Sequence, residues 1–154
     1  YAISFSVTNS YLSYTRSVNI AVLDAQTASV NISGVPRSGS NIALLLADLA
    51  APSRQYILAM SFGNIPGIPL GDGRSIPLNY DPLLLLSVQY PRLIGLENSI
   101  GSLNPQGQAQ ATWNIPSYVP MLTVYLSFFS LDTSLPFPES IVSIAPAVPV
   151  TITP

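Results

Sequence analysis

The stretch Asn104-Pro-Gln-Gly-Gln-Ala-Gln-Ala-Thr-Trp-Asn-Ile115 contains a turn followed by the pattern of a strand. Proline suits the second position of a β-turn and glycine accepts a positive φ, so residues 104–107 predict a tight turn. From residue 108 onward side chains alternate between two faces. The predicted inward set is Ala109, Ala111, Trp113 and Ile115. We expect the turn to join this strand to a preceding strand near residues 93–96.

The same period of two recurs along most of the chain. The predicted strands cover residues 2–8, 18–22, 29–33, 56–62, 121–129, 141–144 and 148–153. Residues 41–51 fit either a short helix or a buried strand, and we favour the strand because the neighbouring segments are β. Leu83–Gln89 is interpreted as a further buried strand, and residues 63–82, which are rich in Gly and Pro, as a long ordered connection with a brief edge pairing.

About nine or ten short strands separated by turn signals, without helical periodicity, predict one all-β domain over residues 1–154. We expect a β-sandwich of the immunoglobulin-like or jelly-roll-like kind. The terminal strands are candidates for exchange with neighbouring subunits.

Charged residues make up only 8% of the 154 residues, against roughly 25% in an average soluble domain. Histidine, cysteine and lysine are absent, which removes the commonest general base, thiolate nucleophiles and Schiff-base chemistry. We therefore predict that the chain is not an enzyme and holds no cofactor. Its five arginines are scattered singly, so no basic stripe for nucleic acid is expected. No stretch reaches the roughly eighteen apolar residues of a membrane helix.

Oxygen-bearing side chains gather in the Gly/Pro-rich connection at Asp72, Asn79 and Asp81. Calcium is held by such oxygen ligands, so these residues are weak candidates for a calcium site. Their spacing matches no calcium motif, and Asp and Asn are also the ordinary residues of turns. Turn chemistry is the favoured interpretation.

Four stretches carry a family resemblance. They are Gly67-Ile-Pro-Leu-Gly-Asp-Gly-Arg-Ser-Ile-Pro-Leu-Asn-Tyr-Asp-Pro-Leu-Leu-Leu-Leu-Ser87, Gly101-Ser-Leu-Asn-Pro-Gln-Gly-Gln-Ala-Gln-Ala-Thr-Trp-Asn-Ile-Pro116, Leu122-Thr-Val-Tyr-Leu-Ser-Phe-Phe-Ser130 and Val148-Pro-Val-Thr-Ile152. Through them residues 55–153 resemble a β-rich module of secreted proteins from planctomycetes and some other bacteria. The chain departs from that module at Ala145-Pro-Ala147, where Ser-Asn is expected. The resemblance implies bacterial export and a β-sandwich, and it carries over no catalytic residue.

A chain so poor in charge lacks the devices that usually protect sheet edges, above all lysine. We therefore predict an extracellular structural subunit that assembles into a filament, pilus-like fibre, sheath or surface layer. The residues predicted to mediate self-association are Ile3, Phe5, Val7, Val148, Val150 and Ile152. The first residue is Tyr1 rather than Met, so we expect export with N-terminal processing. The alternative is a cell-surface adhesion module that binds carbohydrate or protein through its loops.

Overall fold

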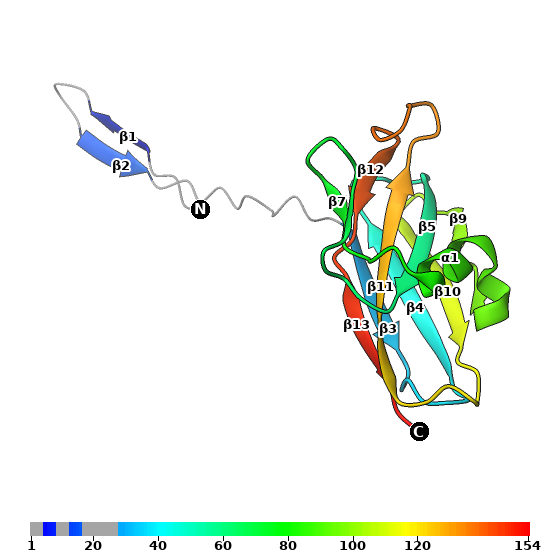
Figure 1. Cartoon of the computed structure of the whole chain (residues 1–154). Helices are drawn as coiled ribbons and strands as arrows, with labels where there is room; N and C mark the ends of the chain where they lie inside the picture. Colours follow the sequence, from blue (N-terminus) through cyan, green and yellow to red (C-terminus); the bar gives the residue numbers. More distant parts are fainter. Residues whose placement is uncertain (1–4, 9–12, 17–27) are drawn as a thin grey trace.

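The structure is a computed structural model that describes residues 5–8, 13–16 and 28–154 (Figure 1). It is mostly β, with 46% strand and 9% helix, which confirms the predicted fold class. The first strands are β1 (Phe5–Thr8), β2 (Ser13–Arg16), β3 (Ala28–Ser33), β4 (Asn41–Asp48), β5 (Gln55–Ser61), β6 (Ile68–Pro69) and β7 (Ser75–Ile76). Helix α1 (Pro82–Gln89) and a 3₁₀ helix (Pro91–Ile94) follow. The remaining strands are β8 (Leu96–Glu97), β9 (Ile100–Ser102), β10 (Gln108–Asn114), β11 (Leu122–Leu131), β12 (Ile141–Ile144) and β13 (Val148–Ile152).

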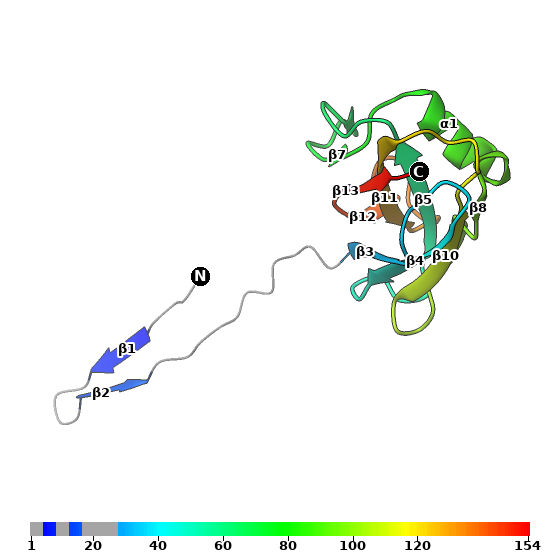
Figure 2. The ribbon, with the colours of Figure 1, turned by 90° about the horizontal axis from the view of Figure 1, so that it is seen from below.

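Two antiparallel sheets form the body of the sandwich. The four-stranded sheet has the order β3-β4-β10-β8. The five-stranded sheet has the order β12-β11-β5-β9, and β13 also pairs with β11. Figure 2 looks along the strands and shows the two sheets as facing layers, with α1 beside β5. Two further two-stranded sheets, β1-β2 and β6-β7, are separate from these layers in hydrogen bonding.

The main core lies between the two sheets and is built by the predicted alternation. From the four-stranded sheet it takes residues such as Ile42, Leu44, Leu46, Ala111 and Trp113, and from the five-stranded sheet Leu58, Met60, Leu126, Phe128 and Ile152. Strand β4 confirms the choice of strand over helix for residues 41–51, since its residues are buried and exposed in turn. The rings of Tyr56 and Phe128 meet edge to face at 6.4 Å between centroids.

A second, smaller core covers the outer face of the five-stranded sheet. Its buried residues are Ala59, Leu70, Ile76, Leu78, Leu84 and Ile141. Half of them come from the Gly/Pro-rich connection, which contains the short β6-β7 pairing as a separate two-stranded sheet rather than as an edge pairing. The five-stranded sheet is therefore covered on both faces. Among the residues that the structure describes, those that pack on the four-stranded sheet cover one of its faces, and the other face carries exposed residues such as Asn31 and Gln110.

One carboxyl group ties the two sheets together. Asp48 lies at the end of β4 and its side chain is fully buried. Its Oδ2 accepts hydrogen bonds from Ser143 on β12 and from Ser130 on β11, the latter at 2.6 Å. The donors belong to the opposite sheet, so these contacts cross the sandwich. Burying a carboxyl group is costly unless it is hydrogen-bonded, and both hydroxyls meet that requirement.

Residues 83–89 form helix α1 rather than the predicted strand, and that prediction was wrong. Asp81 caps the helix, because its Oδ1 accepts from the backbone N–H of Leu84 at 2.9 Å. Pro82 follows in the first turn, where a missing N–H costs nothing. Leucine also favours a helix. An Asp-Pro pair ahead of a leucine run was therefore a helix-start signal that the strand interpretation overlooked.

The turn at residues 104–107 forms as predicted, but it does not join the predicted strands. The Gly107 N–H donates to the carbonyl of Asn104 at 2.8 Å, and Gly107 has a φ of +73°. The strand before the turn is β9 in the five-stranded sheet, so the turn carries the chain from one sheet to the other. Of the segment expected near residues 93–96, only Leu96 is in a strand, because Pro91–Ile94 forms the 3₁₀ helix.

At the N-terminus, β1 occupies part of the strand predicted at residues 2–8 and pairs with β2, with Val7 opposite Tyr14. Ile3 and the strand predicted at residues 18–22 lie outside the described residues.

Replacing Asp48 is expected to weaken the sandwich. The Asp48→Ala variant leaves the hydroxyls of Ser130 and Ser143 without their acceptor in the core, so we expect the free energy of unfolding to fall by about 2–3 kcal/mol. Urea denaturation followed by Trp113 fluorescence measures this change. The matched control is Glu139→Ala, which removes an exposed carboxylate and is expected to change stability by less than about 0.5 kcal/mol. Equal effects of the two substitutions would contradict a structural role for the buried carboxyl group.

Candidate functional site

Sheet edges are the natural sites of strand addition, so each edge of the sandwich was a candidate surface. The edge of β5 is closed by one backbone carbonyl and two side chains where its pairing with β9 ends. Leu58 N–H donates to the Ser99 carbonyl at 2.7 Å. Met60 N–H donates to Ser87 Oγ on α1 at 3.0 Å, and Phe62 N–H to Asp81 Oδ2 at 2.8 Å. Helix α1 and its cap thus take the place of a neighbouring strand.

The edge of β13 is largely closed too. Thr153 N–H donates to the Pro36 carbonyl at 3.1 Å, and the Thr153 carbonyl accepts from Ser38 N–H at 2.9 Å. Backbone groups alternate in direction along an antiparallel strand, so those of Thr151 and Pro149 point to the same side as those of Thr153. Proline has no N–H to offer. Only the backbone of Thr151 is left with both groups on that side.

On the four-stranded sheet, the direction of the β4 backbone can be derived from its end contacts. Asp48 N–H donates to the Gly107 carbonyl at 2.7 Å, and the Ser40 carbonyl accepts from Ile115 N–H at 2.8 Å. Both contacts lie on the β10 side. Because backbone groups alternate in direction along a strand, the N–H and carbonyl groups of the even-numbered residues of β4 point toward β10. Those of residues 43, 45 and 47 point toward β3.

Within residues 28–154, this alternation leaves the outer edge of β3 open. Residues 43, 45 and 47 stand opposite Ser33, Asn31 and Ser29, which therefore bond to β4. The backbone groups of Ala28, Val30 and Ile32 point to the other side. Within residues 28–154, no backbone hydrogen bond to β3 occurs other than those with β4. This six-residue edge carries neither charge nor proline, and β8, at the opposite edge of the same sheet, has only two residues.

The uncovered face of the four-stranded sheet is hollowed into a shallow trough. Its volume is about 440 Å³, and it is lined by Asn31, Leu45, Leu46, Ala47, Asn104, Gln108, Ala109 and Gln110. Asn31, Leu45 and Gln110 stand directly opposite one another across β3, β4 and β10. No charged side chain is part of this lining.

A second depression, of about 250 Å³, is almost wholly apolar. It lies between α1 and the segment that joins β10 to β11 and is lined by Phe62, Leu83, Leu86, Ile94, Trp113, Pro116, Tyr118, Val119, Pro120, Leu122, Val124 and Ile152. The Trp113 indole N–H is satisfied by the carbonyl of Ile94 at 3.0 Å. Phe62 and Tyr118 at its rim are 54% and 81% exposed, so apolar surface is left in contact with solvent here.

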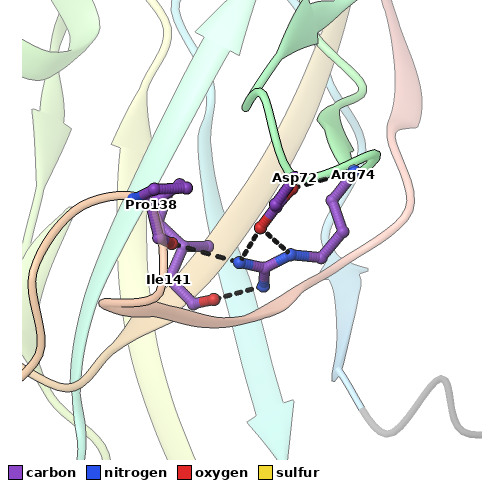
Figure 3. Close-up of polar contacts among 4 residues, drawn as sticks. All are labelled: Asp72, Arg74, Pro138 and Ile141. Carbon is purple, nitrogen blue, oxygen red and sulfur yellow. Dashed lines mark hydrogen bonds and ion pairs between the residues drawn. The ribbon is translucent and has the colours of Figure 1, made fainter.

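Of the calcium candidates, Asp72 is held by an arginine. Its Oδ2 accepts from Arg74 Nε at 2.7 Å and pairs with Nη2 at 2.6 Å (Figure 3). The same guanidinium donates to the carbonyls of Pro138, at 3.1 Å, and Ile141. Arg74 therefore fixes the loop between β6 and β7 to the loop before β12, and Asp72 serves as its counter-ion.

Asn79 and Asp81 lie in a different cluster, around Ser61. Asn79 Oδ1 accepts from Gly67 N–H at 3.2 Å. Asp81 Oδ2 accepts from Ser61 Oγ at 2.8 Å in addition to its bond with Phe62. Both side chains order the connection and the start of α1. Among the residues with described positions, no three His, Cys, Asp or Glu side chains gather as a metal site would require.

The residues predicted for self-association are divided between the two ends of the chain. Val148, Val150 and Ile152 lie in β13, which pairs with β11 of the same chain, and the last two are buried in the core. At the other end, Phe5 and Val7 lie in β1. A role in self-association stays a prediction for all of them. None of the helices in the described part is long and apolar enough to cross a membrane.

No protein-family model matches the chain, and no curated protein is significantly similar to it. The resemblance to the planctomycete module therefore stays a prediction, and the surfaces themselves must carry the functional argument.

Sequence reasoning missed the open edge of β3 and the edge-closing role of Ser87. The direction of a backbone N–H follows from strand register, which the sequence does not contain. The sequence did contain a signal for Ser87. It lies within the apolar run Leu83–Val88, and a serine on a buried surface needs a hydrogen-bond partner.

Removing the Ser87 hydroxyl is expected to destabilise the fold by about 1–3 kcal/mol, since the Met60 N–H loses its acceptor in a buried place. Thermal or urea denaturation of Ser87→Ala measures this loss. Ser102→Ala, which removes an exposed hydroxyl from β9, serves as the control and is expected to stay within about 0.5 kcal/mol of the parent. A Ser87→Ala variant as stable as the parent would contradict the edge-closing role.

Stability is expected to fall in acid through Asp72 and Asp132. Hydrogen bonds from Arg74 lower the pKa of Asp72, and hydrogen bonds from Ser134, followed by Arg54, lower that of Asp132, both below the ordinary 3.8. A lowered folded-state pKa stabilises the fold above the unfolded pKa, and this stabilisation is lost as the pH falls through the folded value. Melting temperatures between about pH 5 and pH 2 test this window. The Asp72→Asn and Asp132→Asn variants should melt lower at pH 7 and lose less on acidification. A slope equal to that of the parent would contradict the assignment.

Proposed function

We propose that this chain is an extracellular structural subunit whose copies join by strand addition at the open edge of β3. The open edge is the observation that carries the proposal. Its outward N–H and carbonyl groups are the template that a strand from another molecule would pair with.

Two of the other edges support this choice by contrast. The β5 edge is occupied by Ser87 and Asp81, and the β13 edge by Pro149 and the contacts of Thr153. A protein whose sole task was to stay monomeric would gain from similar protection on β3. An edge of six uncharged residues, left without proline or lysine, is what a subunit that polymerises requires.

The N-terminal strands supply a partner for this edge. Strands β1 and β2 form a two-stranded sheet in which each strand has four residues. A two-stranded sheet of this size is marginal in water on its own and needs further strands or a packing surface. Pairing of this sheet with β3 of a neighbouring copy would give the sheet a further strand and would give the β3 edge a partner. A head-to-tail contact of this kind propagates into an open filament unless its rotation closes the assembly into a ring.

Weak charge repulsion also favours association. The net charge is −2, and two of the cations, Arg54 and Arg74, are already paired with Asp132 and Asp72. A surface with little net charge resists close approach poorly. The apolar depression beside α1 adds exposed apolar surface that a neighbouring copy could cover.

A pair of substitutions at Ile32 tests the proposal. Ile32→Pro and Ile32→Ala both remove the side chain, but only proline also removes the outward N–H. Because that N–H does not bond to β4, both variants are expected to fold, as judged by circular dichroism and melting temperature. We expect assembly of the proline variant to require at least about tenfold higher concentration than that of the alanine variant. Sedimentation velocity and negative-stain microscopy measure this difference.

Deletion of residues 1–16 is expected to abolish assembly in the same measurements while leaving the sandwich folded. The proposal fails if the full chain sediments as a monomer at high concentration. It also fails if the two Ile32 variants assemble equally well.

A further inference from the structure

The trough on the four-stranded sheet has a layout that neither the fold nor strand addition requires. The register places exposed polar side chains in two columns, on β3 and β10. Between them runs the column of β4, where Leu45 and Ala47 form an apolar floor. The result is a groove with amide walls and an aliphatic base.

The amide groups of this groove are available to a ligand. Asn31, Gln108 and Gln110 are exposed, and their side chains make no hydrogen bond within the described residues. The neighbouring Asn104 is fixed in place, because its Oδ1 accepts from the backbone N–H groups of Gln106 and Gln108 at 2.9 and 2.8 Å. A primary amide offers two donor hydrogens and an acceptor oxygen, so it can match a hydroxyl group in either role.

Charge decides between the classes of ligand. No basic side chain lines the trough, so nothing compensates the charge of a nucleic acid or an anionic polysaccharide. A stable protein interface needs a well-packed apolar centre and roughly 800 Å² of buried surface from each partner. Here Leu45, at 41% exposure, is the only large apolar side chain exposed on the floor. An uncharged, hydroxyl-rich chain with aliphatic C–H faces matches both the walls and the base.

We propose that the trough over β3, β4 and β10 binds a neutral polysaccharide, with Asn31 and Gln110 hydrogen-bonding its hydroxyl groups across the Leu45 floor. Asn31 and Gln110 stand on opposite sides of Leu45, so a sugar unit lying on the leucine meets an amide on each side. This site differs from the open β3 edge: the trough uses the side chains of odd-numbered residues of β3, and the edge uses the backbone of even-numbered ones.

Affinity gel electrophoresis tests this site with four neutral polysaccharides, namely dextran, xyloglucan, glucomannan and galactomannan, and with alginate as the anionic comparison. We expect at least one neutral polysaccharide to retard the full chain and alginate to have no effect. The Asn31→Ala/Gln110→Ala double variant is expected to bind at least about tenfold more weakly, because two hydrogen-bonding groups are lost. The matched control, Gln55→Ala/Gln89→Ala, removes two exposed amides outside the trough and should bind like the parent.

The Ile32→Pro variant separates this proposal from strand addition. It keeps the amide side chains of the trough, so a neutral polysaccharide should still retard it. Absence of retardation in all four neutral gels overturns the proposal. So does equal retardation of the double variant and its control, or stronger retardation in alginate. A double variant that changes the sedimentation of the protein without changing its retardation would assign the trough to a second copy instead and would also overturn it.

Discussion

The need to satisfy the backbone groups at sheet edges constrains this structure more than any other requirement. A sandwich exposes several edges, and lysine is one of the residues that commonly protect such edges, but this chain has none. Here other groups close two of the edges: Ser87 and the capping Asp81 on β5, and Pro149 and the loop contacts of Thr153 on β13. Helix α1 and its N-cap place Ser87 and Asp81 against the side of β5 that faces away from β11, where they accept hydrogen bonds from backbone N–H groups. Within residues 28–154, the edge of β3 has no such cover, which distinguishes it from the edges of β5 and β13.

Individual polar side chains also link distant segments of the fold. Asp48 joins the two sheets through hydrogen bonds from the hydroxyl groups of Ser130 and Ser143. Where the chain does use an arginine, Arg74 contacts a carboxylate and two backbone carbonyls of a distant loop. The Asp48 carboxyl group and the Arg74 guanidinium therefore each hold together segments that are far apart in sequence.

Much of the fold could be predicted from period-two alternation, and the failures have physical causes. Strands β4, β11 and β13 could be predicted because one face of each is buried and the other face is more exposed. Leu83–Val88 has no such alternation, and only the cap before it distinguishes a helix from a buried strand. The crossing after β9 was missed because a turn sequence sets local geometry and not the sheet to which each arm belongs. The open edge and the trough depend on register between distant strands, so no local pattern could reveal them.

Strand β3 belongs to both proposed surfaces, and this has a consequence for the assembled state. Its odd-numbered side chains form one wall of the trough, while its even-numbered backbone groups form the edge, so occupation of one does not block the other. A strand added at that edge would lie beside the wall and extend the uncovered face of the sheet. In a polymer, the troughs would recur at the spacing of the subunits. Weak binding at each trough would then combine into strong binding to one long polysaccharide, since binding at successive sites becomes intramolecular after the first.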